Sequence, residues 1–142
     1  MRRTGWIGLA LLAALAGVGL GGWVYWRETA PVEVRLVAAV DNLPFTVETI
    51  PPVVEARPGQ MISVTFRIRN NAVMPIAAYG RLNVVPAAAQ DQIRIYLTQC
   101  GGLNTFQNSY AADYQVLFRV QPAGLTGQQQ ITLLHTFTPA TP

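Results

Sequence analysis

The stretch I-S-V-T-F-R-I-R at residues 62–69 alternates strictly between apolar and polar side chains. Its apolar members are Ile62, Val64, Phe66 and Ile68, and hydroxyl or arginine side chains fill the positions between them. Successive side chains of a β-strand point to opposite faces, so this pattern predicts a strand with one face in a hydrophobic core and one face in water.

Further strands are predicted on both sides of this stretch. Residues 116–120 and 131–137 repeat the alternation, and residues 32–40 follow it loosely. Pro51 and Pro52 separate two short extended pieces and exclude a helix there. About seven short strands with turns roughly every ten residues predict an all-β fold, an immunoglobulin-like β-sandwich. We expect the apolar side chains of the 116–120 stretch to face the core from the other side or the edge of the sandwich.

The N-terminal segment has the properties of a membrane anchor. Residues 5–26 carry no charge, and at about 1.5 Å per residue they would cross a hydrocarbon layer of about 30 Å. Arg2 and Arg3 predict that the N-terminus stays inside. A cleaved signal peptide is the alternative, but its apolar region is usually shorter, about 7 to 15 residues. We therefore expect a short cytoplasmic tail and a transmembrane helix over residues 1–28 and a periplasmic domain over residues 29–142.

Two further expectations concern this anchor. No transit peptide fits before its apolar segment, which indicates a single-pass protein of the bacterial inner membrane. Ala13, Gly17 and Gly21 recur every fourth residue and form a small-residue face that favours close helix packing and a possible homodimer. The alternative is that glycine and alanine are simply frequent in membrane helices.

Charge and chemistry exclude two classes of function. The formal net charge is +3, but Arg2, Arg3 and Arg27 flank the apolar segment, and the seven arginines beyond it are balanced by seven acidic residues. The predicted domain therefore has no basic surface for nucleic acid. His135 is the only histidine, and we expect it in a core or surface role rather than in catalysis. The sequence has no nucleophile with a local base signature, no glycine-rich phosphate loop and no carboxylate pair. It therefore does not indicate an enzyme.

Cys100 is the only cysteine, and Gly101 and Gly102 follow it directly. A thiolate is a ligand of soft metal ions, and a glycine turn would let a metal or a partner approach the thiol closely. The alternative is that Cys100 is a small buried hydrophobic residue. Met61 and Met74 are possible thioether donors, but we expect both to fill the core.

Three segments carry a resemblance to a known family. They are N-V-V-P at residues 83–86, the Cys100 loop, and D-Y-Q-V-L-F-R-V-Q-P at residues 113–122. In this order and without a gap they resemble the N-V-T-P, Cys-Phe-Cys-Phe and D-x-P-V-x-F-x-x-D-P-like segments of the CtaG family, the copper-insertion assembly factors of cytochrome c oxidase. Thr98 falls on the first cysteine of that family and Cys100 on the second. Residues 41–47 similarly resemble its D-x-x-P-W-x-F.

The resemblance implies an immunoglobulin-like fold and, as partner, the catalytic subunit of a haem-copper oxidase. The copper site of the family is a pair of thiolates, and this chain keeps one of them. Two hypotheses follow. In the first, the protein is a membrane-anchored Cu(I) chaperone with Cys100 as its metal ligand and with Cu(I) shared between two chains. In the second, it is a metal-free structural assembly factor or adaptor that kept the fold.

Overall fold

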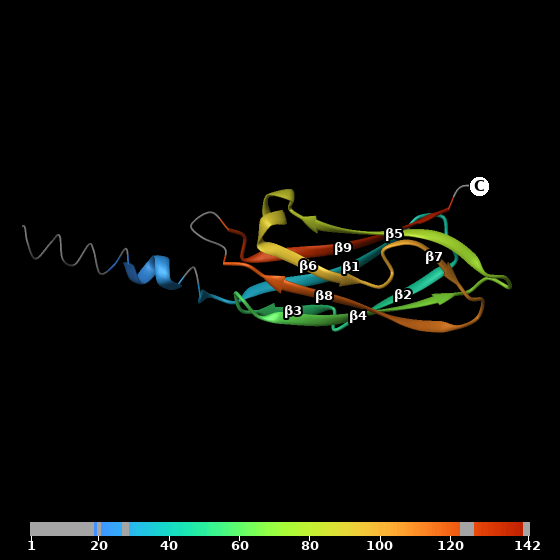
Figure 1. The fold of residues 1–142 in the computed structure, drawn as a ribbon, viewed down its shortest axis with the longest axis horizontal. Coiled ribbons are helices and arrows are strands. Elements are labelled where there is room, and N and C mark those ends of the chain that lie inside the picture. Colours follow the sequence, from blue (N-terminus) through green and yellow to red (C-terminus); the bar gives the residue numbers. More distant parts are fainter. Residues whose placement is uncertain (1–18, 20, 27–28, 123–126, 141–142) are drawn as a thin grey trace, which may run out of the picture.

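The computed structural model describes residue 19 and residues 21–26, 29–122 and 127–140, and shows two β-sheets packed as a sandwich (Figure 1). One sheet has five strands in the order β3-β1-β9-β5-β7, and the other has four in the order β2-β4-β8-β6. The strands are β1 (Val32–Val40), β2 (Phe45–Ile50), β3 (Val53–Ala56), β4 (Met61–Asn70), β5 (Ile76–Val85), β6 (Ile93–Thr98), β7 (Gly102–Phe106), β8 (Ala111–Val120) and β9 (Gln130–Pro139), with a short 3-10 helix, η1 (Ala87–Gln92), between β5 and β6. The all-β sandwich is therefore confirmed, while the narrower immunoglobulin-like classification stays a prediction.

The alternation in β4 corresponds to burial as the sequence predicts. Its four apolar side chains are buried, and those of β8 lie beside them, with Val64 opposite Val116 and Ile62 opposite Phe118. The two strands are direct neighbours in one sheet, so the expectation that β8 lies on the other side or the edge of the sandwich is wrong. The hydrophobic surface of both strands instead packs against β1, β5 and β9 of the facing sheet.

Strands from the two ends of the domain meet in the five-stranded sheet. β1 pairs in parallel with β9 along eight residue pairs, from Glu33 opposite Gln130 to Val40 opposite Phe137. A parallel ladder needs a crossover between its strands, and here the rest of the domain provides it. The inner face of β9, with Ile131, Leu133 and Phe137, thereby becomes the centre of the core.

The predicted membrane anchor falls largely on residues outside the described part of the chain. Residues 1–18, 20, 27 and 28 lie outside it, including Ala13 and Gly17 of the small-residue face. Within the described residues, no helix combines the length and the apolar character needed to cross a membrane.

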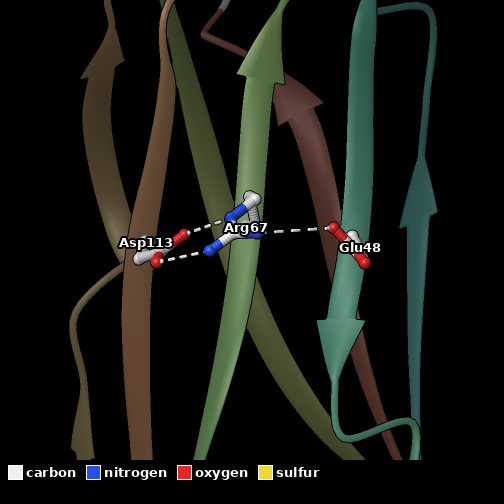
Figure 2. A network of polar contacts seen from close by, with 3 residues as sticks. All are labelled: Glu48, Arg67 and Asp113. Carbon is white, nitrogen blue, oxygen red and sulfur yellow. Dashed lines mark hydrogen bonds and ion pairs between the residues drawn. The ribbon is translucent and has the colours of Figure 1, made fainter.

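An ion-pair network lies on the outer face of the four-stranded sheet (Figure 2). Arg67 of β4 makes two hydrogen bonds to Asp113 of β8, with Nε–Oδ1 at 2.7 Å and Nη2–Oδ2 at 3.0 Å. Its Nη1 also lies 3.8 Å from Glu48 Oε2 of β2. Hydrogen bonding to Arg67 lowers the pKa of the Asp113 carboxyl. The network is exposed and screened by water, so its main effect is to fix the register of three strands.

Candidate functional site

Cys100 lies in the turn between β6 and β7, where the chain crosses from the four-stranded to the five-stranded sheet. Its exposed fraction is 0%, and it belongs to the hydrophobic core between the sheets. The thiol therefore faces the interior of the domain. Of the two interpretations of Cys100, this position is that of the small buried hydrophobic residue.

His135 of β9 is the polar side chain next to the thiol. It is fully buried, and Cys100 Sγ lies 3.6 Å from its Nδ1 and 3.7 Å from its Nε2. The two ring nitrogens point in different directions, so a sulfur almost equidistant from both lies along the N–H or lone-pair direction of neither. The thiol thus packs on the imidazole and does not lie along the N–H or lone-pair direction of either ring nitrogen.

Two phenylalanines enclose the imidazole. The ring of Phe137 stacks on His135 with centroids 4.5 Å apart and an angle of 7° between the planes. The ring of Phe66 approaches it edge-on from the facing sheet at 5.1 Å and 71°. These contacts exclude water from the Cys100–His135 pair and fix the orientation of the ring.

Gly80 of β5 makes the close packing of this pair possible. A Cβ atom at this position would overlap the carbonyl oxygen of Cys100 and would lie 2.9 Å from His135 Nε2. A glycine inside a strand often marks a β-bulge, but β5 is regular at Gly80, since Gly80 pairs with Gly102 on one side and with Phe137 on the other. The glycine is needed because the backbone of the cysteine turn lies directly against it.

Burial keeps both members of the pair uncharged. Desolvation raises the pKa of the Cys100 thiol to about 12. Desolvation also lowers the pKa of His135 to about 4, and a hydrogen bond between the ring and the Cys100 backbone partly offsets this shift. A thiol is a metal ligand or nucleophile only as the thiolate. At neutral pH the pair is therefore a neutral thiol beside a neutral imidazole.

Neither methionine considered as a sulfur ligand lies in the core with Cys100. Met61 lies on the outer face of β4 with 41% of its surface exposed, and Met74 is 63% exposed in the β4–β5 connection. The expectation that these methionines fill the core is wrong. Thr98, at the position of the family's first cysteine, ends β6 and is half-buried. Within the described residues, no three His, Cys, Asp or Glu side chains are grouped to hold a metal.

The sequence alone predicts a core or surface role for His135 and does not connect this residue with Cys100. The two residues are 35 positions apart and lie in different elements, so no local pattern joins them. The alternation of β9 does carry part of the signal, because it puts His135 on the same face as Leu133 and Phe137. A histidine on the inner face of a strand is expected to contact other residues of the core.

The His135 environment predicts an acid-dependent loss of stability. The pKa of the imidazole is about 4 in the folded protein and 6.5 without these surroundings, so the unfolded chain binds the proton more tightly. The contribution of the neutral ring is complete above about pH 6.5 and is lost as pH falls toward 4. Between pH 7 and pH 5 we expect the wild type to lose roughly 2 kcal/mol more unfolding free energy than His135→Phe. Urea unfolding of both proteins measures this difference, and parallel pH profiles would contradict it.

Comparison with known proteins connects this chain to one family. No curated protein matches it. Residues 21–139 match the family described as cytochrome c oxidase assembly protein CtaG/Cox11. The matched region includes all nine strands, the Cys100 turn and His135. Because this match covers most of the sequence, the chain belongs to the cytochrome c oxidase assembly protein CtaG/Cox11 family.

Proposed function

We propose that this protein acts in cytochrome c oxidase assembly as a metal-free structural assembly factor or adaptor. Membership of the family supports the assembly role. The observation that supports the metal-free form is the position of Cys100, which is fully buried against His135 and Gly80. In this form Cys100 stabilises the sandwich and takes no part in metal transfer.

Copper transfer requires two properties of the sulfur that the surroundings of Cys100 do not favour. Cu(I) passes between proteins by exchange of thiolates, which requires a sulfur that a partner can reach and that loses its proton easily. The Cys100 thiol is fully buried, and burial raises its pKa to about 12. A site shared between two chains is subject to the same obstacle, since two such thiols lie inside two separate cores.

A Cu(I) chaperone for the catalytic subunit of a haem-copper oxidase is the second candidate. The retained Cys100 favours it, because this residue falls on the second cysteine of the family motif. His135 adds a nitrogen donor within 3.7 Å, and imidazole with thiolate is a suitable donor set for Cu(I). On this hypothesis copper is the cargo, and the turn around Gly101 and Gly102 opens to expose the sulfur.

The proposal includes a location and a partner. The uncharged segment at residues 5–26 and the arginines before it support a single-pass protein of the bacterial inner membrane, with the β-domain on the periplasmic side. The catalytic subunit of the oxidase is the proposed partner, and a homodimer through the anchor is a further proposal. Reporter fusions at the C-terminus test the orientation.

The metal-free proposal predicts the behaviour of Cys100→Ala. In cells that lack the chromosomal gene, this variant should restore oxidase activity to the wild-type level, because alanine keeps the core apolar and removes only the sulfur. Haem spectra and oxygen consumption of isolated membranes measure assembly. Thr98→Cys, which restores the Cys-x-Cys spacing, should add nothing to the wild type.

The same experiment separates the two candidates when protein levels are equal by immunoblot. If membranes from cells with the Cys100→Ala variant contain the normal amount of this protein but no active oxidase, the result would contradict the metal-free proposal and favour the chaperone. Cys100→Ser is the less suitable variant because it places a buried hydroxyl group beside His135. That group either forms a new hydrogen bond with the imidazole or costs about 1 to 3 kcal/mol when it forms none.

A further inference from the structure

The outer face of the four-stranded sheet has two regions of different character. One contains Arg67 between its carboxylate partners Glu48 and Asp113 (Figure 2). The other lies toward the η1 end of the sandwich (Figure 1), where β6 begins and β8 ends. We call this second region the arginine patch; its residues are Met61 of β4, Arg94, Tyr96 and Leu97 of β6, and Leu117 and Arg119 of β8.

The two arginines of the patch lie directly opposite each other. Arg94 and Arg119 are cross-strand partners in the β6–β8 ladder. Like charges in this arrangement destabilise a sheet. Arg67 has two carboxylate neighbours, whereas among the described residues no carboxylate lies within ion-pair distance of either arginine of the patch. The described part of the chain thus carries a local positive charge here that none of its own carboxylates neutralises.

Tyr96 holds both cations in place. The guanidinium carbons of Arg94 and Arg119 each lie 5.6 Å from the centroid of its ring. Cation–π contacts of this kind orient the side chains before any ligand binds. Arg119 Nε is buried and has no hydrogen-bond acceptor within the described part of the chain. A buried charged donor without an acceptor is costly, and an external anion that neutralised the same guanidinium would reduce that cost.

The surroundings of the arginines are apolar and lie at a sheet edge. Tyr96 is 46% exposed and Leu97 is 42% exposed, and Leu97 is paired with Leu117 across the ladder. Among the described strands, β6 is the last of its sheet, so one side of its backbone pairs with no other described strand. An exposed edge with alternating side-chain contacts is the surface that binds an extended peptide by strand addition.

We propose that the arginine patch binds an extended acidic segment of a partner protein, which lies along β6 and brings carboxylates to Arg94 and Arg119. An extended segment uses all three features of the patch: the free edge, the unpaired cations and the exposed leucine and tyrosine. A membrane surface would use the cations and the exposed apolar side chains but not the free strand edge. This inference does not depend on whether Cys100 binds copper.

A defined peptide tests the proposal on the full chain in mild detergent. The probe is a fluorescein-labelled decapeptide of alternating glutamate and valine, and binding is followed by fluorescence anisotropy. The variant Arg94→Gln with Arg119→Gln should weaken binding at least about tenfold, because it removes two charge-assisted contacts. The matched control is Arg69→Gln with Arg81→Gln, which removes two exposed arginines away from the patch and should change affinity less than about twofold.

Three results would overturn the proposal. The first is equal binding of the peptide by the wild type and the Arg94/Arg119 variant. The second is equal binding of a lysine–valine peptide. The third is binding of phosphatidylglycerol vesicles with the same dependence on Arg94 and Arg119 but no binding of the acidic peptide, which would make the patch a lipid site. Arg94→Gln alone, at an exposed position, keeps the test valid if the Arg119 change disturbs folding, and it should weaken binding about threefold.

Discussion

Gly80→Ala should destabilise the protein by about 3 kcal/mol or more, the upper end of the range for an added atom in a packed core. The new Cβ would overlap the carbonyl oxygen of Cys100, a backbone atom that no rotamer change can move. Removing this overlap would require the β6–β7 turn to move away from β5. This movement would also disturb the contact between Cys100 and His135. Urea unfolding followed by far-UV circular dichroism measures the loss.

Gly101→Ala is the matched control for this change. It adds the same atom in the neighbouring turn, where the nearest contact is the terminal methyl group of Thr98 at 3.0 Å. Because that side chain can adjust, we expect a loss below about 1 kcal/mol. Similar losses for the two variants would show that the cysteine turn does not lie against Gly80 as described.

Phe66→Ala should cost about 3 to 5 kcal/mol of unfolding free energy. The ring is fully buried on the inner face of β4 and contacts His135 edge-on. Its loss leaves a cavity between the sheets beside the Cys100–His135 pair. Thermal and urea unfolding measure the effect, and we expect increased solvent access to the thiol in the same variant.

Ser63→Ala provides the comparison for Phe66→Ala within one strand. Ser63 lies on the outer face of β4 and is exposed, so the unfolding free energy of Ser63→Ala should lie within about 0.5 kcal/mol of the wild-type value. A loss below about 1 kcal/mol for Phe66→Ala would contradict the register of β4. A slip of one residue would turn the whole apolar set outward.

The strands were largely predictable from the sequence because their alternation is local. The 62–69 pattern gives the buried face of β4 correctly, and Pro51 and Pro52 mark the break between β2 and β3. The pairing of strands was not predictable in the same way. The parallel β1–β9 ladder and the direct contact of β4 with β8 join segments far apart in the sequence, and alternation alone does not specify a neighbour.

The site was predictable only in part. The family motif singled out Cys100, but its partner His135 and its neighbour Gly80 come from two other strands. The sequence alone cannot show that the backbone of Cys100 approaches Gly80. Met61 looked like a core residue because methionine is apolar, yet the β4 register places it on the outer face.

Anaerobic Cu(I) titration of the full chain, with Cys100→Ala measured beside it, tests the central claim most directly. Bathocuproine competes for the metal and reports the copper that each protein retains. Because Cys100 is buried and burial raises the pKa of its thiol to about 12, we predict that the wild type retains no more Cu(I) than Cys100→Ala does. Retention of about one Cu(I) per chain, or one per two chains, by the wild type and not by Cys100→Ala would contradict the account.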